Sequence, residues 1–138
     1  MDICQAFQVA FLRKQQKNWQ KIYVLVDIHD TIFKACYQQE EQFRFFPHAK
    51  YVLQKLSQRD DVCLILWSSA YSQALNTYSD FFNKNGIQFN YLNKNPEVVN
   101  TSFQDFTDKL YFNVGIDDKF GFQPQTDWKI LKEYLKTI

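Results

Sequence analysis

The segment "KIYVLVDIHDTIF" (residues 21–33) decides the predicted fold. Its apolar run from Ile22 to Val26 predicts a strand that is buried on both faces, as in a parallel sheet. Charged side chains rarely end a buried strand unless they are paired or bind a metal. Four polar residues follow this strand: Asp27, His29, Asp30 and Thr31. The segment therefore predicts a functional site at the end of a central strand.

The rest of the chain alternates predicted helices and strands. Helices are expected over residues 3–17, from Pro47 to near Ser57, over 70–84, and over 126–135 with Thr126 or Asp127 as the N-cap. Further strands are expected over residues 62–67, 87–92 and 109–116. This alternation predicts one α/β domain over residues 1–138, a Rossmann-like three-layer sandwich with a mainly parallel central sheet and no cap domain.

Composition excludes several classes of protein. The chain has 138 residues, 46% of them apolar and 18% aromatic, which is enough for one domain with a real core. The formal charge of +1 and the scattered basic residues give no nucleic-acid signature. No apolar run approaches the roughly 18–20 residues that span a bilayer. Three cysteines without a C-x-x-C pair and the lack of a signal-peptide pattern predict a cytoplasmic protein with reduced thiols.

Polar side chains follow three of the four predicted strands. Right-handed crossovers bring the carboxyl ends of parallel strands to one edge, where ligands bind. Taken singly, each group has a plainer explanation as a turn, a helix cap or a loop hydroxyl. Together, carboxylates that meet at one edge favour Mg²⁺, and one of them is placed to attack phosphorus. The groups are Asp27 with His29, Ser68 with Ser69, and Asp117 with Asp118.

Three segments resemble motifs of the haloacid-dehalogenase-like phosphohydrolase superfamily. They are "VLVDIHDTIF", "LILWSS" and "DKLYFNVGIDD", and the resemblance covers roughly residues 20–136. It implies that Asp27 is the nucleophile and that Thr31 is the motif threonine. It also implies a Mg²⁺ site and a phosphate site. The implied metal ligands are Asp27, the His29 backbone carbonyl, Asp117 and Asp118; the implied phosphate ligands are Ser68, Ser69 and Lys109, with Lys94 and Lys84 as alternatives to Lys109.

One residue departs from the family pattern. His29 stands where the family usually has a second aspartate, the general acid/base, and Asp30 lies one residue off that spacing. An imidazole exchanges protons near neutral pH, so His29 is the expected acid/base residue. The alternative is an inactive relative, a non-catalytic module that binds a phospholigand or a protein.

The connections between the motifs are too short for a cap domain. In this respect the chain resembles the capless subtype of the family. Such open sites act on macromolecular ends or take a lid from a neighbouring subunit. A homo-oligomer is therefore one of the alternatives for this chain. Residues 32–46 predict a hairpin whose Phe43, Phe45 and Phe46 either cover the site or fill the core. The expected function is Mg²⁺-dependent hydrolysis of a phosphate monoester, on an unidentified phosphorylated substrate, through an aspartyl-phosphate intermediate.

Overall fold

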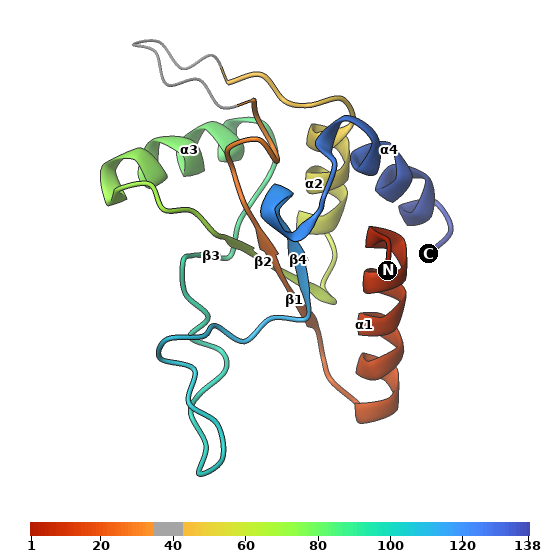
Figure 1. The fold of residues 1–138 in the computed structure, drawn as a ribbon, viewed down its shortest axis with the longest axis vertical. Coiled ribbons are helices and arrows are strands. Elements are labelled where there is room, and N and C mark those ends of the chain that lie inside the picture. The colour runs from red at the N-terminus through yellow and green to blue at the C-terminus, as the bar shows by residue number, and fades with distance from the viewer. Residues whose placement is uncertain (35–42) are drawn as a thin grey trace.

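A computed structural model describes residues 1–34 and 43–138 of the chain. Its elements are α1 (Ile3–Lys17), β1 (Ile22–Val26), α2 (Ala49–Ser57), β2 (Val62–Leu66), α3 (Ser72–Lys84), β3 (Tyr91–Leu92), β4 (Val114–Ile116), the 3₁₀ helix η1 (Asp118–Phe120) and α4 (Pro124–Leu135) (Figure 1). Within the described residues, no helix is long and apolar enough to cross a membrane. Nor do these residues form a separate cap domain.

The four strands form one sheet in the order β3-β2-β1-β4, and every neighbouring pair is parallel. The apolar run that predicted β1 matches the strand residue for residue. Strand β1 is central because it pairs with both β2 and β4. The prediction of a Rossmann-like α/β sandwich with a mainly parallel sheet is confirmed.

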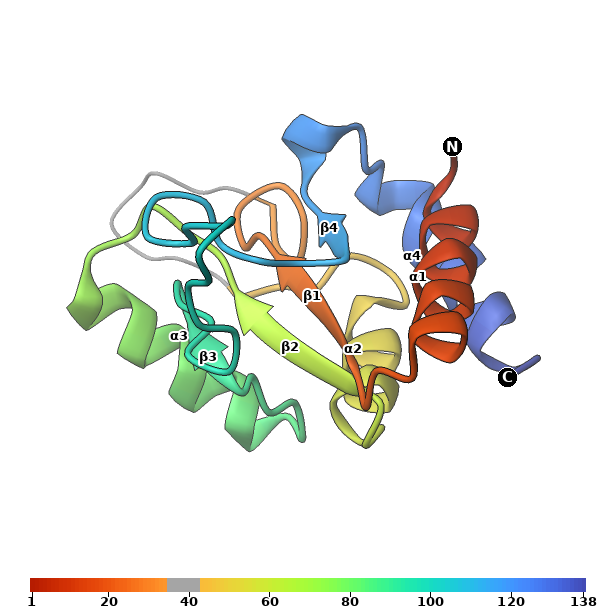
Figure 2. The same ribbon diagram turned by 90° about the horizontal axis from the view of Figure 1, so that it is seen from below.

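The two faces of the sheet have different covers. Alternate strand residues such as Val24 and Leu64 join one large core with the buried side chains of all four α-helices. On the other face Leu25 and Ile65 belong to a smaller cluster, which the irregular segment 93–113 covers with residues such as Phe112. Figure 2 shows the helices on one side of the sheet and this segment on the other. An irregular segment, instead of helices, therefore makes the layer on the second face.

Strands β3 and β4 are shorter than the sequence predicted, because asparagine side chains replace backbone partners at their amino ends. Asn90 donates its N–H to the Leu64 carbonyl, and its Oδ1 accepts from the Leu64 N–H at 2.9 Å. Asn113 pairs in the same way with Tyr23, whose N–H lies 2.8 Å from Asn113 Oδ1. Each asparagine thus forms hydrogen bonds with one N–H and one carbonyl of the neighbouring strand, but the regular backbone pairing does not continue through it.

Three helices begin at residues other than those expected. Helix α3 starts at Ser72, two residues later than predicted. Helix α2 starts at Ala49 instead of Pro47, because exposed His48 has a left-handed φ of 70°. Helix α4 starts at Pro124, so the prediction of Thr126 or Asp127 as N-cap is wrong. Proline suits the first turn because it needs no N–H partner there.

Only the ends of the predicted hairpin 32–46 lie within the described residues. Phe33 and Phe45 form an antiparallel bridge, and the Phe46 N–H donates to the Ile32 carbonyl at 2.9 Å. Phe43, Phe45 and Phe46 are partly buried against the main core. Their contacts agree with the core-filling alternative, whereas residues 35–42 lie outside the described residues.

Candidate functional site

The register of the sheet brings the predicted groups to one edge. Its last row pairs one residue from each strand: Leu92, Leu66, Val26 and Ile116. Backbone hydrogen bonds of 2.8–2.9 Å continue this alignment one step further. The residues that follow the row are Asn93, Trp67, Asp27 and Asp117. Three of the predicted groups follow β1, β2 and β4. The carboxyl ends of these strands therefore share one edge of the sheet.

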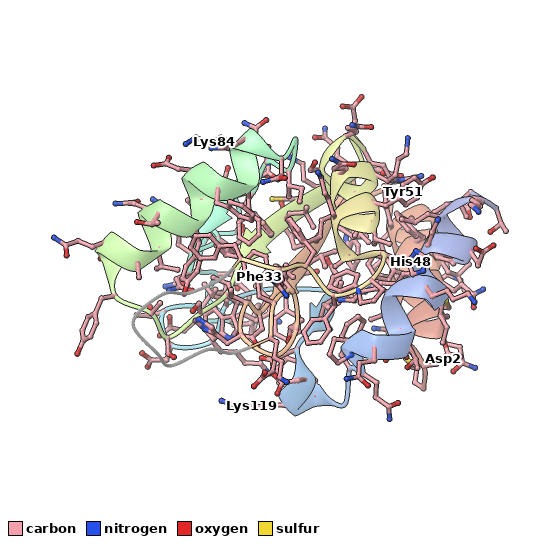
Figure 3. All side chains as sticks on the ribbon, turned by 90° about the horizontal axis from the view of Figure 1, so that it is seen from above. Asp2, Phe33, His48, Tyr51, Lys84 and Lys119 are labelled. Atoms are coloured by element: carbon pink, nitrogen blue, oxygen red, sulfur yellow. The ribbon has the colours of Figure 1, made fainter. Side chains whose placement is uncertain are left out.

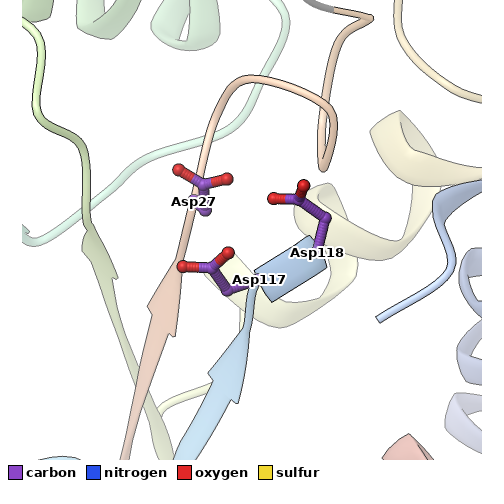
Figure 4. A group of neighbouring side chains, drawn as sticks. All are labelled: Asp27, Asp117 and Asp118. Atoms are coloured by element: carbon purple, nitrogen blue, oxygen red, sulfur yellow. The ribbon is translucent and has the colours of Figure 1, made fainter. Parts of the chain in front are cut away.

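Three carboxylates meet at this edge. Asp27 follows β1, Asp117 follows β4 and Asp118 begins η1, and one carboxylate oxygen of each lies within 4.8 Å of the others (Figure 4). Asp117 is only 7% exposed. Its Oδ1 accepts from the Lys119 N–H at 2.9 Å, which fixes the carboxylate at the start of η1.

Crowding and burial change the titration of two of these groups. Burial, and next the charge of Asp117, raise the pKa of Asp27 from its ordinary value of 3.8 to about 6. Burial is also the main reason that the pKa of Asp117 is raised. Charged carboxylates are therefore disfavoured here unless a cation lies between them.

A tight turn after β1 shapes the edge. The Ile28 carbonyl accepts from the N–H groups of Thr31, Ile32 and Phe33 at 2.8–3.2 Å. Asp30 has a φ of 60°, a left-handed conformation that glycine favours and that aspartate tolerates. The turn directs the chain back over the end of β1 and places Thr31 beside Asp27.

Thr31 holds the carboxylates together. It is fully buried, and its hydroxyl donates to Asp27 Oδ2 at 3.0 Å and accepts from the Asp118 N–H at 3.1 Å. Its carbonyl accepts from the indole N–H of buried Trp128 in α4 at 2.8 Å. Thr31, the residue that matches the motif threonine, therefore links the end of β1, the start of η1 and helix α4 through hydrogen bonds.

Ser68 lies two residues beyond β2, at the carboxyl end of that strand. The hydroxyl of half-buried Ser68 accepts from the Ala70 N–H at 3.1 Å, and Ser69 is exposed. The Asn93 side chain binds the Ser68 backbone twice: Oδ1 accepts from the N–H at 2.8 Å, and Nδ2 donates to the carbonyl at 2.7 Å. Asn93 thus ties the loop after β2 to the segment after β3.

The structure does not bring Lys109 to this edge. Lys109 is exposed and precedes β4, in the segment that covers the second face and extends past the amino ends of β1 and β4 (Figure 1). Lys84 ends α3 and projects from the opposite side of the molecule from Lys119, which follows Asp118 (Figure 3). Lys94 is two residues beyond β3, directly after Asn93, whose N–H still donates to the Leu66 carbonyl. Of the three predicted lysines, Lys94 is the one that follows the carboxyl end of a strand.

His29 packs against α3. Its Nε2 lies 2.8 Å from the hydroxyl of buried Tyr78, and the two rings meet edge-to-face with centroids 5.5 Å apart. The contact holds the imidazole against α3, because Tyr78 belongs to the core on the helical side of the sheet.

Three residues with a part in this geometry were missed or ranked second from the sequence: Asn93, Lys94 and Trp128. Asn93 carried a usable signal, because an asparagine after a strand often takes a left-handed conformation, and its φ is 56°. Trp128 carried none, since only the tertiary structure shows which carbonyl its indole reaches.

Comparison with known proteins identifies a relative by structure. No model of a protein family and no curated protein matches the sequence. A solved structure, described as that of the conserved protein coded by locus from Bacteroides thetaiotaomicron, has 30% sequence identity and a TM-score of 0.64. The similarity covers 85% of this chain and 91% of that one. The chain therefore belongs to the same family as this conserved Bacteroides thetaiotaomicron protein.

Proposed function

We propose that the protein is a Mg²⁺-dependent phosphatase that hydrolyses a phosphate monoester through an aspartyl-phosphate on Asp27. The observation that carries the proposal is the meeting of Asp27, Asp117 and Asp118 within 4.8 Å at the edge that Ser68 also reaches. The resemblance of the surrounding segments to the haloacid-dehalogenase-like phosphohydrolases supports the same function.

The donor set fits the metal. Asp27, Asp117 and Asp118 supply oxygen ligands, and Mg²⁺ prefers a few carboxylates with several retained waters. Burial penalises the charges of Asp27 and Asp117, so a divalent cation would offset an unfavourable interaction that already exists. The His29 carbonyl is a further proposed ligand. Bound Mg²⁺ would supply positive charge to phosphoryl oxygens at this edge.

The protein's own residues divide the remaining chemistry. An oxygen of Asp27 attacks phosphorus, the bond from phosphorus to the ester oxygen breaks, and His29 donates a proton to that oxygen. Water then attacks phosphorus and gives a proton to the now neutral His29, the bond from phosphorus to the Asp27 oxygen breaks, and inorganic phosphate leaves, which regenerates the carboxylate. Thr31 holds Asp27 through its 3.0 Å hydrogen bond, while Ser68 and Lys94 bind the phosphoryl oxygens.

Mg²⁺ should raise the melting temperature of the wild-type protein. A ligand that binds only the folded state stabilises it by mass action, and saturating Mg²⁺ should add roughly 5 °C or more. The measurement is thermal unfolding in EDTA and in millimolar Mg²⁺. The matched control replaces Asp117 and Asp118 with Asn, which keeps their shapes and removes two charges. No shift in the wild type, or an equal shift in the double variant, contradicts a metal site here.

The lysine assignment gives a second prediction. Lys94→Met should lower kcat/KM for phosphate esters by roughly 10²–10³-fold, the usual effect of losing one preorganised charge-stabilising group. Lys109→Met is the matched control and should leave kcat/KM nearly unchanged, because Lys109 lies four residues before Asn113, which pairs with Tyr23 near the amino end of β1. Steady-state kinetics of both purified variants measure this. A large loss in Lys109→Met with none in Lys94→Met would restore the original assignment.

A second candidate function is a non-catalytic module that binds a phospholigand. The observation that favours it is His29, which replaces the family aspartate and already contacts the Tyr78 hydroxyl at 2.8 Å. Under this alternative, Mg²⁺ and phosphate bind, but no ester in a broad panel is hydrolysed. Turnover by the wild type excludes it.

A further inference from the structure

We infer that Asn93 is a positioning residue that sets Ser68 and Lys94 at a fixed separation, so that both grip one phosphoryl group. This inference rests on the proposed function. Its basis is that both polar groups of the Asn93 side chain, Oδ1 and Nδ2, form hydrogen bonds with the backbone of a single residue, Ser68.

The backbone of Asn93 is unusual for its position. Its φ of 56° lies in the left-handed region that favours glycine, directly after β3. Glycine would meet the backbone requirement without strain, so the asparagine side chain needs another role. That role is visible in its two short hydrogen bonds of 2.7 and 2.8 Å to Ser68, 25 residues earlier in the chain.

These two bonds form what we call the Asn93 clasp. Neighbouring parallel strands lie about 4.8 Å apart, and a loop beyond the last ladder hydrogen bond is otherwise free to move away from its neighbour. The clasp holds the Ser68 peptide against the chain that carries Lys94, the next residue after Asn93. The Ser68 N–H is engaged by Asn93, and the Ser68 hydroxyl oxygen accepts from the Ala70 N–H, so the hydroxyl hydrogen is the group that Ser68 can donate to a ligand.

Asn95 holds the other side of Lys94. It is 8% exposed, its Nδ2 donates to the Tyr111 carbonyl at 2.9 Å, and its Oδ1 accepts from the Glu97 N–H at 3.2 Å. Lys94 thus lies between two asparagines whose side chains are both committed to backbone groups. These hydrogen bonds hold the backbone on both sides of exposed Lys94 in a defined position.

The chain contains two matched controls. Asn18 ends α1 with the same φ of 56°, and within the described structure its side chain makes no hydrogen bond. Asn90 binds the Leu64 N–H at 2.9 Å between the same two strands, but three residues earlier than Asn93 and away from the carboxyl edge. Asn18→Gly controls for the backbone conformation, and Asn90→Ala controls for the loss of a comparable hydrogen bond.

The experiment measures binding of inorganic phosphate in the presence of Mg²⁺ and, separately, hydrogen exchange of the Ser68 amide in EDTA. In Asn93→Gly, phosphate affinity should fall roughly tenfold and Ser68 exchange should accelerate. In Asn93→Asp, Ser68 exchange should stay slow, because a carboxylate oxygen still accepts from the N–H. Neither Asn18→Gly nor Asn90→Ala should weaken phosphate binding, although Asn90→Ala should lower the melting temperature.

The outcomes separate this inference from the proposed function. Wild-type phosphate affinity in Asn93→Gly, an equal weakening in Asn90→Ala, or unchanged Ser68 exchange in Asn93→Gly overturns the positioning role alone. A wild-type protein that neither binds phosphate with Mg²⁺ nor hydrolyses any ester overturns the proposed function, and the positioning role with it.

Discussion

Replacing Asp27 with Asn should lower the hydrolysis of phosphate esters by roughly 10⁴-fold or more while the protein stays folded. The amide keeps the size of the carboxylate, and its oxygen still accepts the hydrogen bond that the Thr31 hydroxyl donates at 3.0 Å. What it loses is the anionic oxygen that we propose attacks phosphorus. Steady-state hydrolysis of an aryl phosphate, with circular dichroism as the check on folding, measures the effect.

The matched control is Asp60→Asn, which removes an exposed carboxylate just before β2, at the other edge of the sheet. Its turnover should equal that of the wild type. If Asp27→Asn keeps most of the wild-type turnover, Asp27 is not the nucleophile.

The same variant should be more stable than the wild type in EDTA. Because the pKa of Asp27 is raised from 3.8 to about 6, the folded protein binds this proton more tightly than the unfolded chain. The associated stability is fully present below about pH 3.8 and is lost as pH rises through about 6. Asn has no such loss, so the advantage of the variant should grow from pH 4 to pH 7, to roughly 1–2 kcal/mol after solvent screening. A pH series of melting curves for both proteins tests this.

His29→Asn should lower kcat/KM for alkyl phosphates by roughly 10²–10⁴-fold, the usual share of general acid–base catalysis. Aryl phosphates should lose far less, because a phenolate leaves without a proton. The contact with Tyr78 makes Tyr78→Phe a useful companion, since it removes the hydroxyl 2.8 Å from Nε2 and keeps the ring. His29→Asp introduces the aspartate that is usual in the haloacid-dehalogenase-like phosphohydrolases and should keep or raise activity.

The comparison of ester classes decides the role of His29. Equal losses on alkyl and aryl esters in His29→Asn would mean that His29 is structural. Asp30, the next residue, would then be the first candidate for the proton donor.

The central strand and its acidic end could be predicted because their signals are local. A continuous apolar run marked β1 to the residue, and the carboxylates that follow β1 and β4 occupy the edge that parallel topology dictates. Helix α1 was equally clear, since its apolar residues recur at helical spacing over Ile3–Lys17.

The place of Lys94 at the carboxyl edge and the clasp could not be predicted because both depend on the pairing of the strands. Lys109 adjoins an apolar segment that the sequence presents as one strand, yet only Val114–Ile116 pairs with β1. Lys94 follows a strand of only two residues, which has almost no periodic signal. That Asn93 binds Ser68 depends on the pairing of β2 with β3, and no pattern within either segment encodes that contact.

A crystal structure of the protein with Mg²⁺ and fluoroberyllate tests the central claim most directly, because fluoroberyllate mimics a phosphoryl group on a carboxylate. We expect beryllium on an Asp27 oxygen, Mg²⁺ between Asp27 and Asp117, and fluorine atoms bound by Ser68 and Lys94. Asp118 should lie beside the metal, either as a direct ligand or through one of its waters. A structure in which fluoroberyllate binds elsewhere, or in which Mg²⁺ is absent from this edge at saturating concentration, would contradict the account.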